Sequence, residues 1–174
     1  MKAATATKLL IGLAFSFAAA CADSATSVTA VHDPLAAASS SPVLVECPTD
    51  DLVQSSGLVT PLGGTVSAGG TTITVPPGAV LLPTTITVTV PPSQFMEVDI
   101  TANDASSFVF QLPVTVSLSY ARCTRSDIEK DALSVWYIDS ATKALLQNMG
   151  GGDDKTARTV TFTTDHLSGY AVAN

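Results

Sequence analysis

From Val43 onward, the chain is dominated by an alternation of apolar and hydroxyl-bearing residues. Segments 84–90 (TTITVTV) and 114–120 (VTVSLSY) place an apolar or aromatic residue at every second position, with threonine or serine between. A period of two predicts strands with one buried face and one face in water, and β-branched residues fit that pleated surface. Further strands are predicted at 64–68, 71–75, 95–100, 107–112, 133–139, 144–149, 158–163 and 169–173.

Turn-forming residues separate these segments. Proline fixes φ and has no N–H to donate, whereas glycine tolerates positive φ, so both suit tight connections. Many short strands at close spacing predict an all-β fold, an antiparallel β-sandwich or barrel. One short helix is expected at 126–131, where Ser126 and Glu129 form a capping box. The turns are Gly69-Gly70, Pro76-Pro77-Gly78, Pro91-Pro92 and the run GGGDD at 150–154.

The first residues follow a different pattern. Lys2 and Lys8 lead into an uncharged stretch, LLIGLAFSFAAA, that is too short to span a bilayer and ends directly before Cys21. This is the layout of a secretory signal peptide covering residues 1–20, and a cysteine at the cleavage point indicates a lipoprotein. We expect an exported protein of the bacterial cell envelope, on its periplasmic or outer face, anchored by a lipid on Cys21. Cleavage after Ala20 or Ala22 by an ordinary peptidase is the alternative.

The segment after Cys21 differs again, because 22–42 lacks aromatic residues and any sustained apolar period. Such a segment cannot recover the entropy lost on ordering, so we expect a disordered tether with a reach of roughly 25 Å. His32 lies within it and is not expected to be a ligand or a catalyst. The predicted organisation is a signal peptide at 1–20, a tether at 21–42 and one domain at 43–174.

Three cysteines are an odd number for an exported protein. Lipidation would occupy Cys21, which leaves Cys47 and Cys123 as a pair in an oxidising compartment. We predict a disulfide between them, and closing so long a loop contributes roughly 4 kcal/mol in the chain-entropy model. The alternative is that both are unrelated buried thiols.

The charge balance limits the partners. The chain has 8 basic residues against 15 acidic residues, a net charge of −7, and loss of Lys2 and Lys8 with the signal peptide makes it more acidic. Nucleic acid binding needs clustered Lys and Arg, so nucleic acid is excluded. Adsorption to anionic lipid is disfavoured for the same reason. The expected partners are the membrane, through the anchor, and a protein of the envelope.

Segment 63–80, GGTVSAGGTTITVPPGAV, resembles the opening of the ZU-five domain of ankyrins and netrin receptors. Members have a Gly-rich start, an alternating strand and a Pro-Pro-Gly-Ala turn, here at 76–79. Segments 110–120 and 163–172 fit the same resemblance, which covers about 57–173. It implies a β-sandwich that serves as a structural or interaction module.

The sharpest chemical candidate is the triplet His166-Leu167-Ser168. It resembles the self-cleaving site of adhesion receptors and some ZU-five proteins, and this implies that the Ser168 hydroxyl attacks the preceding carbonyl. Such chemistry needs a base beside the hydroxyl, supplied by His166, and a strained Leu167–Ser168 peptide bond. The alternative, which we favour, is that His166 and Ser168 satisfy backbone groups at a tight turn.

Other chemistry has little support in the sequence. The motifs G-x-S-x-G and H-E-x-x-H, the P-loop and the dinucleotide fingerprint are all missing, so we expect neither a conventional enzyme nor a cofactor. Asp153-Asp154 could offer oxygen ligands to calcium, but a plain hairpin tip is favoured. Asp50-Asp51 is expected to be a solvated loop. A carbohydrate- or calcium-dependent adhesin is a third alternative, based on the acidic loops and the hydroxyl-rich strand faces.

Overall fold

The domain is an all-β sandwich of antiparallel sheets. A computed structural model describes residues 41–105, 107–124, 128 and 132–174, and none of these is helical. They belong to one compact unit, Ser40–Asn174, which contains every strand of the described residues and begins close to the predicted boundary at Val43. The predicted signal peptide, Cys21, the tether apart from residues 41–42, and most of the predicted helix at 126–131 lie outside the described residues.

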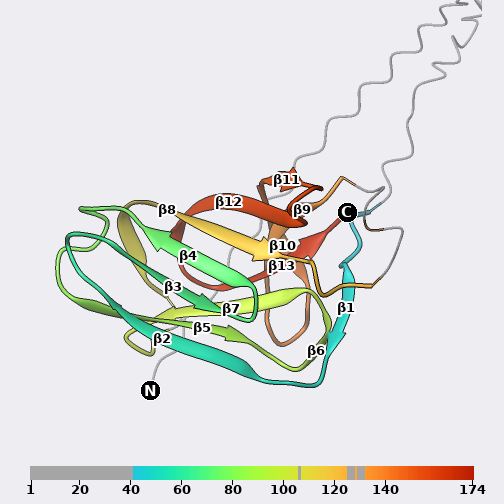
Figure 1. The fold of residues 1–174 in the computed structure, drawn as a ribbon, viewed down its shortest axis with the longest axis horizontal. Helices are drawn as coiled ribbons and strands as arrows, with labels where there is room; N and C mark the ends of the chain where they lie inside the picture. The colour runs from blue at the N-terminus through green and yellow to red at the C-terminus, as the bar shows by residue number, and fades with distance from the viewer. Residues whose placement is uncertain (1–40, 106, 125–127, 129–131) are drawn as a thin grey trace, which may run out of the picture. The chain divides into compact units, whose positions relative to one another are not determined.

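The first sheet has six strands in the order β10-β9-β13-β7-β5-β2 (Figure 1). The last strand of the chain, β13, lies in the interior of this sheet, between β9 and β7, and all five of its residues are buried. The strands are β2 (Val53–Val59), β5 (Thr84–Val90), β7 (Glu97–Ala102), β9 (Ser134–Ile138), β10 (Leu145–Gly150) and β13 (Gly169–Ala173).

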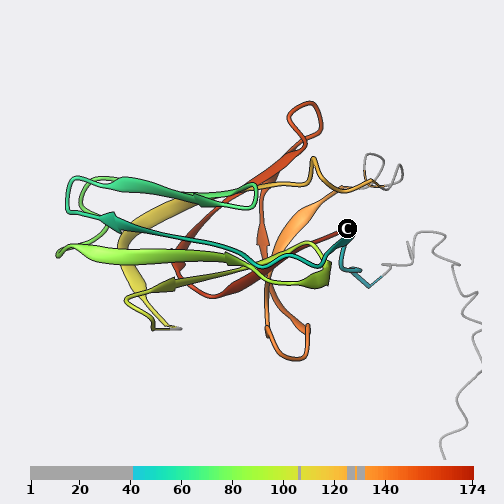
Figure 2. The ribbon, with the colours of Figure 1, turned by 60° about the horizontal axis from the view of Figure 1, so that its bottom comes forward.

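The second sheet has five strands in the order β11-β12-β8-β4-β3, and Figure 2 shows the two layers side by side. A separate pair, β1 (Glu46–Thr49) with β6 (Ser93–Phe95), lies at the end of the sandwich where the C-terminus is also found. The strands of the second sheet are β3 (Gly64–Ala68), β4 (Thr71–Val75), β8 (Val109–Ser119), β11 (Gly152–Asp154) and β12 (Thr159–His166).

The core lies between the two sheets and follows the alternation of the sequence. In β8, Val114, Val116 and Leu118 are fully buried, while the hydroxyl residues between them are partly exposed. Tyr120 and Tyr170 are also fully buried. The period of two therefore identified the core face of this strand correctly.

The hydroxyl-rich faces pair across strands. The hydroxyl oxygens of Ser117 and Thr161 lie 2.9 Å apart between β8 and β12, and those of Ser67 and Thr72 lie 2.9 Å apart between β3 and β4. Thr87 differs from the prediction, because it is buried. Its hydroxyl is satisfied there by Ser56, at 2.8 Å. Such cross-strand pairs each stabilise a sheet by a few tenths of a kcal/mol.

Two predicted strands at 107–112 and 114–120 are one strand, β8. Pro113 lies between the two predicted segments and has no N–H for the ladder. The structure accommodates it at a register shift, where Thr164 of β12 pairs with Val114 and His166 pairs with Val109. A bulge tolerates proline because the ladder is interrupted there.

Three other predictions also need correction. The predicted strand at 95–100 is divided, because Phe95 pairs with β1 whereas Glu97 begins β7. No alternation of apolar and polar residues predicted β2, VQSSGLV, in which most side chains are exposed or partly exposed. Asp153-Asp154 is not a hairpin tip, because both residues belong to β11. The predicted strands at 64–68, 71–75, 84–90 and 169–173 are confirmed as β3, β4, β5 and β13.

Candidate functional site

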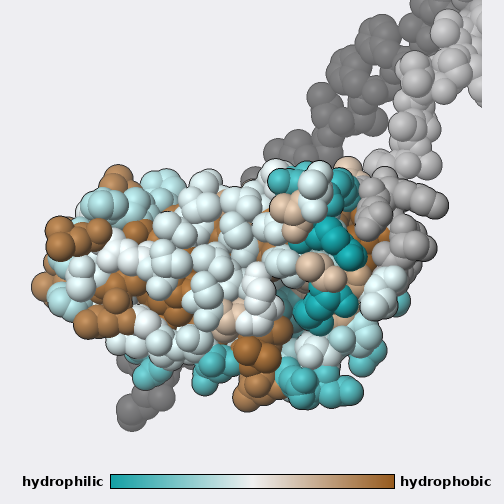
Figure 3. Space-filling view, viewed as in Figure 1, coloured by the Kyte–Doolittle hydropathy of each residue, from teal (hydrophilic) through white to brown (hydrophobic). Residues whose placement is uncertain are grey.

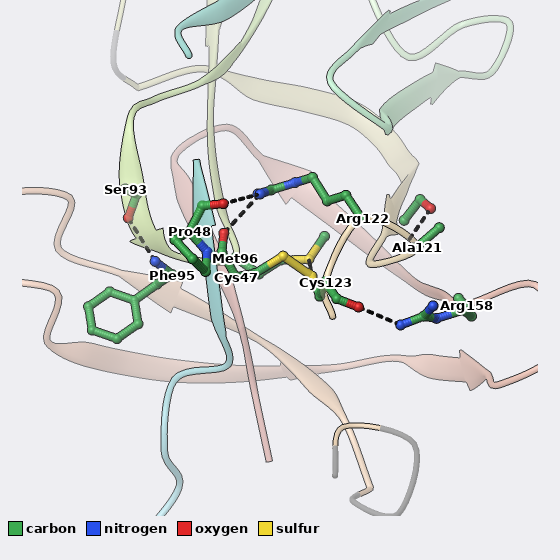
Figure 4. The surroundings of a disulfide bond; sticks show 10 residues. Cys47, Pro48, Ser93, Phe95, Met96, Ala121, Arg122, Cys123 and Arg158 are labelled. Carbon is green, nitrogen blue, oxygen red and sulfur yellow. Dashed lines mark hydrogen bonds between the residues drawn. A yellow bond between two sulfur atoms is a disulfide. The ribbon is translucent and has the colours of Figure 1, made fainter. Parts of the chain in front are cut away.

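The predicted disulfide is present. Cys47 of β1 is bonded to Cys123, which follows β8, over a sequence separation of 76 residues and a Cα–Cα distance of 4.9 Å (Figure 4). Both cysteines are 2% exposed, and the sulfur of Met96 lies 3.7 Å from Cys123 Sγ. The bond joins the minor β1–β6 pair to the main sandwich.

Two arginines hold the backbone around this disulfide (Figure 4). Arg122 Nη1 donates to the carbonyl oxygen of Cys47 at 2.8 Å, and Arg158 Nη2 donates to the carbonyl oxygen of Cys123 at 2.7 Å. Arg158 itself has φ +52°, a left-handed conformation at the turn before β12. Charged donors strengthen hydrogen bonds to carbonyl groups, so both ends of the disulfide are fixed by guanidinium contacts.

The His166-Leu167-Ser168 triplet forms the corner between β12 and β13. The Tyr170 hydroxyl donates to the His166 carbonyl oxygen at 2.5 Å, and the His166 N–H donates to Thr164 Oγ1 at 3.2 Å. Leu167 is 2% exposed, and its N–H donates to the Phe108 carbonyl oxygen at 3.1 Å. Hydrogen bonds to Thr164, Tyr170 and the Phe108 backbone thus hold the corner in place.

The arrangement does not place a base beside the Ser168 hydroxyl. His166 Nδ1 lies 3.1 Å from Asp165 Oδ1 and 3.3 Å from Thr164 Oγ1, and no hydrogen bond among the described residues reaches the Ser168 hydroxyl. No residue of the triplet has a positive φ, and the described chain has no cis peptide bond. The favoured alternative also needs correction, because the side chains that satisfy the corner's backbone are those of Thr164 and Tyr170.

Two pKa shifts occur at this corner. Burial raises the pKa of Tyr170 to about 12, since the phenolate would lose its hydration. The hydrogen bond to His166 lowers the pKa of Asp165. Tyr170 is therefore a neutral donor across the physiological range, consistent with its hydrogen bond to the His166 carbonyl.

An acidic cluster on the six-stranded sheet was missed by the sequence analysis. Glu97 is 5% exposed, and its Oε2 accepts an ion-paired hydrogen bond from Lys143 Nζ at 2.7 Å, while Oε1 has no hydrogen-bond partner. Beside it, Ser140 Oγ donates to Asp99 Oδ1 at 2.6 Å, directly over Gly169. The spacing of the two carboxylates could have predicted this cluster, since Glu97 and Asp99 share one face of the predicted strand at 95–100.

Asp153, which was considered as a calcium ligand, is occupied by protein groups. Its Oδ1 accepts from the Tyr120 hydroxyl at 2.8 Å, and its Oδ2 lies 2.6 Å from Lys155 Nζ. Asp50 and Asp51 are exposed outside any strand, as predicted. Within the part of the chain that the structure describes, no group of three or more His, Cys, Asp or Glu is placed to hold a metal ion.

Exposed hydrophobic side chains gather at the end of the sandwich opposite the C-terminus, at the left of Figure 3. Leu62, in the β2–β3 turn, is 85% exposed, and Leu81 and Leu82, in the β4–β5 loop, are 72% and 73% exposed. We call this surface, with the nearby Leu112 of β8, the leucine end. The sequence analysis did not identify it, because its residues come from connections rather than from one strand.

No protein-family model matches the chain, and no curated protein matches it. The resemblance to ZU-five domains therefore stays a prediction, whereas the β-sandwich itself is established by the strand pairing. No helix in the described ranges is long and apolar enough to cross a membrane.

Proposed function

We propose that this chain is a non-catalytic lipoprotein of the bacterial cell envelope, in which a ZU-five-like β-sandwich serves as a structural or protein-interaction module. The buried Cys47–Cys123 disulfide is the observation that carries this proposal. It bonds β1, the first strand after the predicted tether, to the body of the sandwich. A load on the Cys21 anchor would then act on a covalent bond as well as on the short β1–β6 pairing.

The disulfide also supports an exported location, because such bonds persist in oxidising compartments. The self-cleaving alternative gains no favourable observation, since no described hydrogen bond joins His166 to the Ser168 hydroxyl. The adhesin alternative gains none either, because many strand hydroxyls pair with one another and Asp153 is bound by protein groups.

Metabolic labelling with a fatty acid tests the anchor. The full-length chain should carry label and sediment with membranes, and Cys21→Ser should lose the label and be found in the soluble fraction, because no other thiol is available at the cleavage point. Ala22→Ser, which keeps Cys21, is the matched control and should remain labelled. A wild-type chain that is secreted without label would contradict the proposed anchor.

Affinity capture tests the interaction role separately. Residues 43–174, with the disulfide intact, should retain a specific envelope protein, and the same domain after reduction and heat denaturation should not. Retention of the same proteins by both samples would contradict a role that depends on the folded sandwich.

A further inference from the structure

We infer that the leucine end inserts into the headgroup layer of a lipid bilayer, which gives the domain a membrane contact independent of its anchor. The biological setting of this contact rests on the proposed envelope location. Its chemistry rests on exposure, charge, backbone hydrogen bonding and chain geometry. Leu62, Leu81 and Leu82 are the three most exposed large apolar side chains of the described residues, and they lie at the tips of two adjacent connections.

The two leucine-bearing connections carry no charge, although the exposed Asp104, in the β7–β8 connection, lies at the same end of the sandwich. No Asp, Glu, Lys, Arg or His occurs between Asp51 and Glu97, which includes both leucine-bearing connections, and none occurs between Asp104 and Arg122, which includes β8. Ionised groups are costly to bring into a bilayer, and their absence from both connections permits close approach to lipid.

Hydrogen bonds within the protein satisfy most of the β2–β3 tip and join it to the β4–β5 loop. The N–H of Gly63 donates to the Thr60 carbonyl oxygen at 2.8 Å, and the N–H of Gly78 crosses from the other tip to the Pro61 carbonyl oxygen at 2.9 Å. Leu62 N–H reaches Thr60 Oγ1 at 3.3 Å. Such satisfaction is needed where water is scarce, because each unsatisfied group costs several kcal/mol in hydrocarbon.

Prolines reduce the number of backbone N–H groups that need an acceptor. Four positions in the two connections have no N–H: Pro61, Pro76, Pro77 and Pro83. The N–H groups of 80–82 have no hydrogen-bond partner among the described residues. This limits the depth of insertion: the tips reach the hydrated headgroup layer, as interfacial segments do, and not the hydrocarbon core.

The composition favours lipid over a protein partner. The large apolar side chains exposed on the two connections are leucines. Leucine is under-represented among the binding hot spots of protein interfaces, whereas interfacial membrane segments use it on their apolar face.

The predicted tether is long enough for this orientation. The described chain begins beside the C-terminus, where the Asn174 N–H donates to the Val43 carbonyl oxygen, at the end opposite the leucines. The 11 residues of β8 span about 36 Å along the sandwich. Segment 22–42 has an r.m.s. reach of roughly 25 Å and covers about 70 Å when fully extended, so the span of the sandwich requires it to be only partly extended. A domain anchored at Cys21 can therefore turn its leucine end toward the same membrane.

Vesicle flotation with the chain from Ala22 to Asn174 tests the inference. This chain lacks Cys21 but keeps the compact unit Ser40–Asn174 with its core and disulfide, so any binding is independent of acylation. It should float with neutral phosphatidylcholine vesicles, equally at low and high salt, because the contact is apolar. Leu62→Ser and Leu81→Ser should each weaken binding about tenfold, from the loss of one buried leucine.

Leu52→Ser is the matched control, since Leu52 is 63% exposed but precedes β2 at the opposite end. It should float like the unmodified chain. Failure of the unmodified chain to float would overturn the inference, as would equal flotation of Leu62→Ser. Leucine-dependent dimerisation in sedimentation, without flotation, would also overturn it and assign this end to a second copy. Failure of the fatty-acid labelling of Cys21 leaves this assay unaffected, so the two proposals fail separately.

Discussion

Tyr170 shows how one hydroxyl can fix a corner of the fold. It is fully buried, and its hydroxyl contacts both the His166 carbonyl oxygen and Thr164 Oγ1. A buried hydroxyl without a partner would be costly, so its burial and its hydrogen bonds depend on each other. The sequence pointed to His166 and Ser168 as candidate catalytic residues. The side chains that hold this corner are instead those of Thr164 and Tyr170.

Tyr170 should make the domain sensitive to high pH. Its pKa in the folded chain, about 12, lies above the ordinary value of 10. The free energy of unfolding is therefore at its full value below pH 10. It falls by about 3 kcal/mol as the pH rises through 12, because only the unfolded chain readily loses the proton. Urea unfolding at pH 8 to 12 measures this. Tyr170→Phe should be less stable at pH 8 by about 1 kcal/mol and lack this added sensitivity, whereas Tyr137→Phe should retain it. Equal pH dependence in all three proteins would contradict the assignment.

At the scale of elements, connections determine how regular strands are combined. The β2–β3 turn is tight because Gly63 adopts φ +88° and its N–H donates to Thr60. A Cβ added there would lie 2.5 Å from the Val75 carbonyl oxygen of β4. Glycine is required at this position by both conformation and close backbone approach.

Gly63→Ala should therefore lower the free energy of unfolding by about 2–3 kcal/mol, since it combines left-handed strain with a backbone clash. Gly152→Ala in β11 is the control, because an added Cβ meets nothing within 4 Å there. It should change stability by less than about 0.5 kcal/mol. Chemical denaturation of both variants gives the comparison, and equal losses would contradict the role of Gly63.

For the whole molecule, the disulfide connects parts that are distant in sequence. The β1–β6 pair is short and irregular, with a register shift between Glu46 and Thr49. Two-stranded pairs of this size are marginal alone. Cys47–Cys123 and the Arg122 contact attach this pair to the sandwich.

Removing the bond should be costly. Cys47→Ala combined with Cys123→Ala should lower the free energy of unfolding by roughly 4 kcal/mol, because a loop of 76 residues is no longer closed in the unfolded state. Urea denaturation measures the loss, and Met96→Leu, which changes the adjacent sulfur but keeps the bond, should lose far less. A double variant as stable as the wild type would show that the bond contributes nothing to the free energy of unfolding.

The sequence alone determined the all-β class, the core face of β8 and the pairing of Cys47 with Cys123. A period of two can be recognised within a single strand, and only two cysteines remain once Cys21 is assigned to the anchor. Only the tertiary structure decided the rest. Pro113 lies inside one strand because β12 changes register beside it. The leucine end forms because two connections that carry no strand signal meet across a hydrogen bond from Gly78 to Pro61. Contacts between distant residues follow from packing, which leaves no periodic trace in the chain.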